Sequence, residues 1–102
     1  MKVVITKCGV GKVASALTVS VLKLEYKCEN IIFIGTAGAL TDKTQPGDIV
    51  ISTGSVQHDF DGRPFIEKCT VFAVGEKIIK SSDKLQKICK SAAYKFLAQN
   101  PI

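Results

Sequence analysis

Two short glycine-rich segments contain the residue types that could hold a small ligand. Residues 9–14 read GVGKVA, which fits the G-x-G-x-x-[G/A] fingerprint of dinucleotide-binding turns and follows an apolar segment. The fingerprint also needs an acidic residue about 20 positions further on, and the segment there ends in IGTAG without one. A phosphate-binding P-loop does not fit either, because Thr6 and Val13 replace its first glycine and its Ser/Thr. Two interpretations remain: a turn that brings backbone amides close to a ligand, and a tight turn without further function.

The second segment, residues 35–39, reads GTAGA and follows the apolar run at residues 31–34. Its small residues would let a flat ligand lie against the backbone, and the Thr36 hydroxyl could hold a water, a hydroxyl group or an anion. An ordinary turn is the alternative. In open α/β sheets ligands bind outside the carboxyl ends of the strands, so two such turns at one sheet edge favour a binding site.

A third group of polar residues lies in the long loop at residues 54–66. His58, Asp59 and Asp61 could be drawn as a metal cluster, or His58 and Asp59 as half of a catalytic pair. A single histidine on a polar loop more often makes a structural hydrogen bond, and we predict no metal site and no cofactor. Phe65 is an apolar ring on a polar loop, and we expect it to cover a ligand or a partner.

The elements that would position these residues are predicted from hydrophobic patterning. Short β-branched or continuous apolar runs predict buried strands, and apolar residues at helical spacing predict helices that pack on a sheet. A serine, Ser81 or Ser82, is expected to cap the second helix. The predicted order is β-α-β-β-loop-α, an α/β fold, with strands at about 2–7, 31–35 and 48–53, helices at about 12–27 and 82–98, and a weak strand near 70–74.

The kind of positive charge argues against a nucleic-acid-binding protein. The chain has 102 residues and a formal net charge of +5, but its basic residues are nearly all lysines, with Arg63 the one arginine. Nucleic-acid readers usually use arginines and stacking aromatic residues, so we predict no nucleic-acid partner. The C-terminal excess of positive charge is interpreted as a solvated helix face that carries Lys84, Lys87, Lys90 and Lys95.

The cysteines and the apolar segments indicate the compartment. The four cysteines form no CxxC pair and only one histidine is present, so a zinc site is not expected. The sequence shows no leader pattern and no run of 18 apolar residues. We therefore expect a cytoplasmic protein without a membrane partner, with four free thiols mostly in the core.

Four segments in order, GVGKVA, IGTAGAL, PGDIVIS and QHDFD, together resemble the purine nucleoside phosphorylase/nucleosidase superfamily. The 5′-methylthioadenosine/S-adenosylhomocysteine nucleosidases are the nearest group. The resemblance implies a partial three-layer α/β/α fold, with residues 1–102 as a single incomplete domain. It also implies hydrolysis of the N-glycosidic bond of methylthioadenosine or S-adenosylhomocysteine, a reaction of methionine salvage.

The resemblance also implies roles for individual residues. Val10 corresponds to the apolar residue near the 5′-substituent of the nucleoside, and Thr36 to the residue that helps hold the attacking water, or phosphate in the phosphorylases. Ala37 and Gly38 match the backbone segment beside the purine. Phe65 matches the aromatic residue that each subunit lends to its neighbour's site, which implies a homodimer with His58 and Asp59 as structural parts of the loop.

The acid and base groups of that family have no matching positions in this sequence. The family uses a glutamate that activates water, a Met-Glu pair that holds the ribose and an aspartate that protonates the purine. All of these groups fall outside the segments that match this sequence. Asp48 does not replace any of them, because it belongs to a turn. We therefore expect a truncated chain that is inactive on its own. The alternatives are a phosphorylase that uses phosphate and a non-catalytic remnant that binds nucleosides or dimerises.

Overall fold

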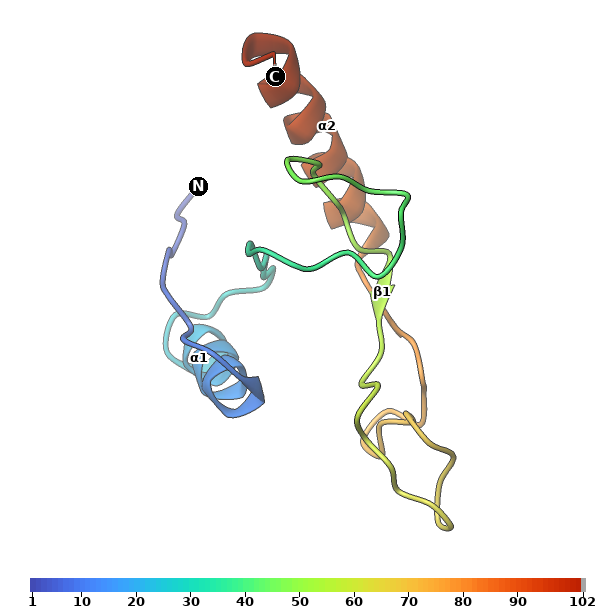
Figure 1. The fold of residues 1–102 in the computed structure, drawn as a ribbon. Coiled ribbons are helices and arrows are strands. Elements are labelled where there is room, and N and C mark those ends of the chain that lie inside the picture. Colours follow the sequence, from blue (N-terminus) through green and yellow to red (C-terminus); the bar gives the residue numbers. More distant parts are fainter. Residues whose placement is uncertain (102) are drawn as a thin grey trace. The chain divides into compact units, whose positions relative to one another are not determined.

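The computed structural model describes residues 1–101, which contain two helices and one pair of short strands. Their order is α1 (Lys12–Leu24), β1 (Gly54–Ser55), β2 (Ile79–Lys80) and α2 (Asp83–Gln99) (Figure 1). The chain divides into two units, Met1–Ala37 and Gly38–Ile102, and each is described by itself. The mixed α/β class agrees with the prediction, whereas three layers are not seen in the described residues.

In the first unit, α1 begins and ends at residues in unusual backbone conformations. Gly11 is the N-cap with a φ of 98° and no side-chain cap, and its carbonyl accepts the Ser15 N–H at 3.1 Å. At the other end Lys27 has a φ of 55°, and the Cys28 N–H turns back to the Leu22 carbonyl at 3.0 Å. The helix therefore starts where the sequence predicts and ends three residues earlier than predicted, because the left-handed residue stops the helical repeat.

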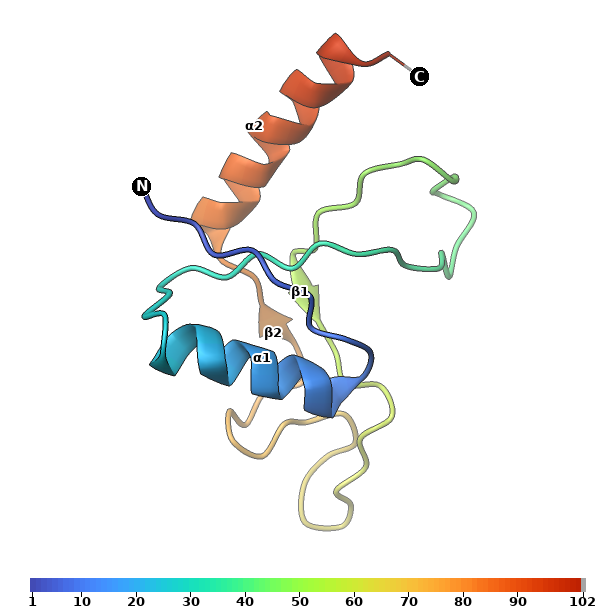
Figure 2. The same ribbon diagram turned by 90° about the vertical axis from the view of Figure 1, so that its left-hand side faces the viewer.

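The second unit contains the antiparallel pair of β1 and β2. Gly54 faces Lys80 and Ser55 faces Ile79, and the Ser81 N–H extends the pairing to the Thr53 carbonyl at 3.0 Å. Figure 2 shows the long loop that connects these two strands and returns along itself. The weak strand predicted near residues 70–74 is wrong: a tight turn follows Val71 there, closed by a single bridge from Val71 to Glu76.

The helix α2 agrees with the prediction to within one residue at each end. The Ser82 hydroxyl accepts the Leu85 N–H at 3.3 Å, which identifies Ser82 as the cap. Asp83 follows in the first turn, where its negative charge interacts favourably with the helix dipole. Local signals of this kind are sufficient to place a helix start.

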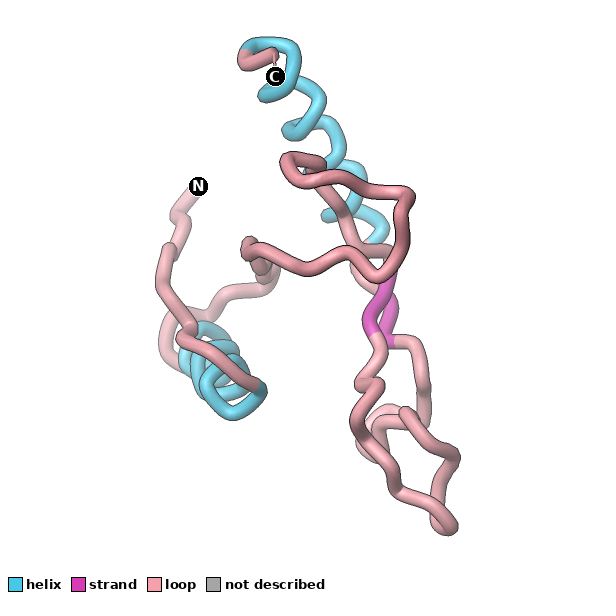
Figure 3. Tube along the Cα trace, in the orientation of Figure 1, coloured by secondary structure: helices cyan, strands magenta, loops and turns pink. Residues whose placement is uncertain are grey.

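The three predicted buried strands at 2–7, 31–35 and 48–53 are not strands in this structure. Residues 1–101 contain one ladder, between β1 and β2, and the three segments run as loop (Figure 3). Their side chains are also not buried: Phe33 is 77% exposed and Ile34 is 88% exposed. A β-strand requires a hydrogen-bonded neighbour as well as a suitable sequence. Within residues 1–101, the backbone of these segments is paired with another segment at one point, where the Thr53 carbonyl accepts the Ser81 N–H.

The helix faces and cysteines are likewise more exposed than expected. No hydrophobic side chain within residues 1–101 is buried, and Val13 and Leu17, two apolar residues at helical spacing in α1, are 75% and 64% exposed. A shallow hollow of about 350 Å³ separates this helix from residues 4–6. All four cysteines are free, as predicted, but they are partly exposed rather than core residues.

Candidate functional site

The first glycine turn presents its apolar residue to solvent. Gly9 and Gly11 have φ values of 71° and 98°, a region that residues with a Cβ rarely adopt. A Cβ added at Gly9 would lie 3.5 Å from the Ala14 Cβ, an ordinary contact, and one at Gly11 would meet nothing within 4 Å. Backbone conformation, rather than lack of space, is therefore what calls for glycine here. Val10, between them, is 99% exposed and is followed by Gly11, the N-cap of α1.

The second glycine segment lies across the division between the units. Thr36 and Ala37 are exposed and belong to the first unit together with Val10, whereas Gly38 begins the second unit. Gly35 is close to an aromatic ring, since a Cβ there would lie 3.1 Å from Cε1 of Phe33. The structure thus brings Val10, Thr36 and Ala37 into one unit, and the roles of these residues stay a prediction.

In the 54–66 loop, an ion pair engages the single arginine. Arg63 Nε and Nη2 donate to Asp61 Oδ1 and Oδ2 at 2.8 and 2.5 Å, and the Arg63 backbone N–H donates to Oδ1 at 3.2 Å. The hydrogen bonds from Arg63 lower the pKa of Asp61 to about 2, and the same pairing raises the pKa of Arg63. Asp61 is therefore ionised at neutral pH and cannot act there as a proton donor.

Aromatic packing organises the rest of this loop. The rings of Phe60 and Phe72 meet edge to face with centroids 5.9 Å apart, and the Phe60 carbonyl accepts the Cys69 N–H at 2.8 Å. The His58 carbonyl accepts a weak hydrogen bond from the Cys69 thiol at 3.5 Å. Phe65, by contrast, is 88% exposed, although its N–H is bonded to the Gly62 carbonyl. The loop therefore has one partly buried ring, Phe60, and one ring, Phe65, that is exposed to solvent.

A metal centre does not form in the described part of the chain. Among residues 1–101, no three His, Cys, Asp or Glu side chains are grouped so that they could hold a metal ion. His58 and the two neighbouring aspartates thus do not make the cluster that could be drawn from their spacing.

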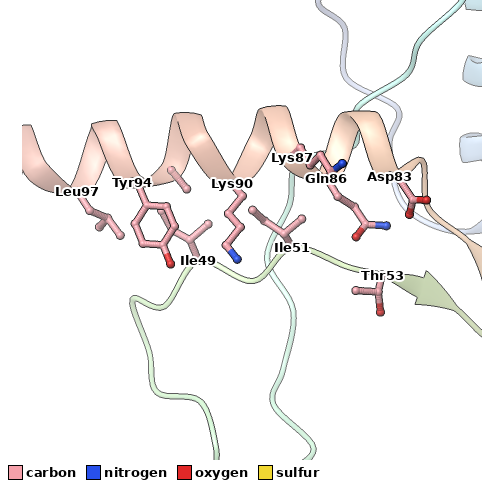
Figure 4. A pocket seen from close by; sticks show the side chains of 10 residues that line it. Ile49, Ile51, Thr53, Asp83, Gln86, Lys87, Lys90, Tyr94 and Leu97 are labelled. Carbon is pink, nitrogen blue, oxygen red and sulfur yellow. The ribbon is translucent and has the colours of Figure 1, made fainter.

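A groove in the second unit was missed by the sequence reasoning. It is a groove of about 610 Å³ between residues 49–53 and one face of α2 (Figure 4). Lys87 and Lys90, expected on a solvated helix face, line this groove. Alternation along residues 49–53 and helical spacing along α2 are the signals that could have revealed it. The lining residues are Ile49, Ile51, Thr53, Asp83, Gln86, Lys87, Lys90, Ala93, Tyr94 and Leu97.

None of the predicted site residues lines this groove or the smaller hollow beside α1. Val10, Thr36, Ala37, Gly38 and Phe65 are all absent from both linings. The groove lining and the predicted nucleoside-binding residues therefore have no residue in common.

Comparison with known proteins gives a consistent set of relatives. The family model of the phosphorylase superfamily matches residues 1–99. A protein of Actinobacillus succinogenes named 5′-methylthioadenosine/S-adenosylhomocysteine nucleosidase is 34% identical over 93 residues, which cover 91% of this chain and 40% of that protein. A protein of the same name from Buchnera aphidicola is 47% identical over 57 residues, or 56% of this chain and 23% of that protein.

A third relative with that name, from Mycobacterium bovis, is 44% identical over 59 residues, which cover 58% of this chain and 23% of its own length. The matched part of the chain thus spans between about a quarter and two fifths of these relatives. No solved structure matches the chain. Neither helix of the described residues is long and apolar enough to cross a membrane.

Proposed function

The chain belongs to the phosphorylase superfamily, and on this basis we propose that it forms the nucleoside-binding part of an enzyme that hydrolyses the N-glycosidic bond of a purine nucleoside. The observation that carries the proposal is the 34% identity over 93 residues with a protein named as a methylthioadenosine/S-adenosylhomocysteine nucleosidase. The proposed substrates are therefore methylthioadenosine and S-adenosylhomocysteine. The reaction would serve methionine salvage in the cytoplasm.

In this proposal the two glycine segments bind the nucleoside. Val10 contacts the apolar 5′-substituent, Thr36 orients the attacking water, and the backbone at Ala37 and Gly38 lies beside the purine. Val10 is 99% exposed and Thr36 is exposed, so both side chains are accessible to a ligand.

Phe65 is assigned to a second subunit's site. Its ring is 88% exposed, whereas the other aromatic residue of the 54–66 loop, Phe60, is partly buried and packs edge to face against Phe72. A large exposed ring of this kind is suited to bury itself against a partner. We accordingly propose a homodimer in which each copy lends Phe65 to its neighbour.

Hydrolysis is favoured over phosphorolysis by the state of Arg63. In hydrolysis a water oxygen bonds to the anomeric carbon while the bond to the purine nitrogen breaks, and a proton must reach the departing purine. A phosphorylase needs in addition a cationic site for phosphate, and in this chain the guanidinium of Arg63 is already engaged by both oxygens of Asp61. The proton donor for the purine is not Asp61, since its pKa of about 2 leaves it ionised.

The experiment is an assay of adenine release from methylthioadenosine by the enzyme of which this chain is proposed to form a part, in phosphate-free buffer and with added phosphate; the 102-residue chain alone is expected to release no adenine. We expect equal release in both buffers, with methylthioribose as the second product. Release that requires phosphate would make the protein a phosphorylase, and saturable binding of methylthioadenosine without release would make it a nucleoside-binding module.

A pair of substitutions tests the role of Thr36. Thr36→Val removes the hydroxyl at nearly constant volume, and we expect a loss of release on the order of 100-fold, as for other groups that orient or stabilise reacting oxygens. Thr36→Ser keeps the hydroxyl and should retain the activity. Equal activity of the two variants would refute the assignment of this residue.

A further inference from the structure

Gly62 occupies a point of the 54–66 loop where a side chain does not fit. A Cβ added there would lie 2.5 Å from Cγ2 of Ile66 and 2.9 Å from Cε2 of Phe72, and both separations are shorter than real Cβ contacts. Its φ is not one of the positive values of the chain, so the backbone conformation would accept alanine. The requirement for glycine is therefore one of space, in contrast to the first glycine turn.

The backbone of Gly62 also anchors the residues that follow it. Its carbonyl accepts the N–H groups of Phe65 and Ile66 at 3.1 and 3.2 Å. Immediately before it, both carboxylate oxygens of Asp61 are bonded to the guanidinium of Arg63. The chain from Asp61 to Ile66 is thus closed on itself, and the starting point of the Phe65 side chain is set by the Gly62 carbonyl.

The two side chains next to Gly62 cannot move aside freely. Ile66 is half-buried, and its Cγ2 branches directly from Cβ, so this methyl moves only with the χ1 rotamer or with the backbone. The ring of Phe72 meets the ring of Phe60 edge to face with centroids 5.9 Å apart, and the Cys69 N–H is bonded to the Phe60 carbonyl at 2.8 Å. A methyl group added at Gly62 would therefore shift the backbone of the turn or break this ring contact.

Resting on the proposed function, in which the Phe65 ring enters the neighbouring subunit's site, we propose that Gly62 is the positioning residue for Phe65. The ring is apolar and belongs beside the apolar 5′-substituent of the nucleoside. A methyl group at Gly62 displaces Ile66, and the displacement reaches Phe65 through one peptide bond. The missing side chain of Gly62 thus sets how tightly the enzyme holds the 5′-substituent.

Substrate selectivity distinguishes this role from a general structural one. A ring that covers the methylthio group contributes to the binding of methylthioadenosine and much less to that of 5′-deoxyadenosine, which has a hydrogen in place of that group. The contact exists in the ground state as well as in the transition state, so its loss raises KM and leaves kcat nearly unchanged. A displaced ring therefore reduces the discrimination between the two nucleosides rather than the activity in general.

The test compares both nucleosides as substrates of the enzyme of which this chain is proposed to form a part. In Gly62→Ala we expect the KM for methylthioadenosine to rise about 10-fold, the lower end of what one apolar contact discriminates. The KM for 5′-deoxyadenosine should change by less than about threefold, and kcat by less than about twofold.

Two further variants separate crowding at Gly62 from a general loosening of the loop. Gly75→Ala strains the turn after Val71, where φ is 73° and a Cβ would meet nothing within 4 Å, and it should leave the ratio of the two KM values unchanged. Gly62→Ala with Ile66→Ala removes the crowded Cγ2 and should return the ratio toward that of Ile66→Ala alone. This double variant provides the measurement if Gly62→Ala by itself does not fold.

The turn can also be measured in the 102-residue chain without substrate. The amides of Phe65 and Ile66 share the Gly62 carbonyl. In Gly62→Ala both amides should exchange with solvent about 2- to 10-fold faster, as the loss of one ordinary hydrogen bond allows. The same amides should keep their original rates in Gly75→Ala.

An active Gly62→Ala enzyme with an unchanged KM ratio, or an equal loss of discrimination in Gly75→Ala, would overturn the positioning role and leave the proposed function standing. A double variant that keeps the altered ratio would exclude Ile66 as the crowded neighbour. Unchanged exchange at Phe65 would show that the space around Gly62 does not control the turn. Absence of adenine release by the unaltered enzyme would instead refute the proposed function, together with the role that depends on it.

Discussion

Replacing Gly11 with alanine tests whether the first glycine turn is required by backbone conformation. Gly11 has a φ of 98° and a ψ of 168°, a region that is almost restricted to glycine. An added Cβ would meet no atom within 4 Å, so steric crowding contributes nothing. The cost of the substitution is then the backbone strain alone, about 1–3 kcal/mol.

The most direct measurement is amide hydrogen exchange at Ser15, whose N–H donates to the Gly11 carbonyl at 3.1 Å and closes the first turn of α1. A strain of this size corresponds to an acceleration of exchange of about 5- to 150-fold. The matched control is Gly38→Ala, because Gly38 has an ordinary φ and open space around its Cα. Unchanged exchange in Gly11→Ala, or an equal acceleration in Gly38→Ala, would refute the argument from backbone conformation.

Two further predictions concern the second unit. Ser82→Ala removes the hydroxyl that accepts the Leu85 N–H, and urea unfolding of α2 should show a loss of about 1 kcal/mol, whereas Ser81→Ala should change it little; equal losses would contradict the cap assignment. Arg63→Gln should return the pKa of Asp61 from about 2 toward 3.8 in a carboxyl NMR titration. Because pairing with Arg63 lowers the pKa of Asp61, the ion pair stabilises the loop above about pH 4, and this stabilisation is lost as the pH falls through about 2. A pKa of Asp61 that stays near 2 in Arg63→Gln would show that Arg63 does not cause the lowered pKa.

The helices were predicted well because their determinants are local. The glycine turn before Lys12 and the serine cap before Asp83 each lie within a few residues of the helix they start. The early end of α1 depends on the positive φ of Lys27. Lysine rarely adopts a positive φ, so the residue type at this position does not indicate that the helix ends nearby. The strands were predicted less well, because pairing depends on segments far away in the chain.

In the candidate site, too, features set by neighbouring residues were predicted, whereas features that join distant segments were missed. The positive φ values of Gly9 and Gly11 agree with the prediction of a sharp turn. The groove was missed because it needs Ile49 and Lys90 together, and these residues are separated by a long loop. Patterns within one segment indicate which face is apolar, but they do not indicate which other segment will lie opposite.

The exposed apolar run at residues 31–34 has a consequence for the behaviour of the protein in concentrated solution. Its four residues are apolar, mostly β-branched and uncharged, and Phe33 and Ile34 are more than three quarters exposed. Such segments nucleate cross-β aggregates when like chains meet, and electrostatic repulsion between chains is what keeps them apart. That repulsion weakens as the pH approaches the isoelectric point of about 9.1, so colloidal stability should be high in acidic, low-salt buffer and should fall to a minimum near that pH.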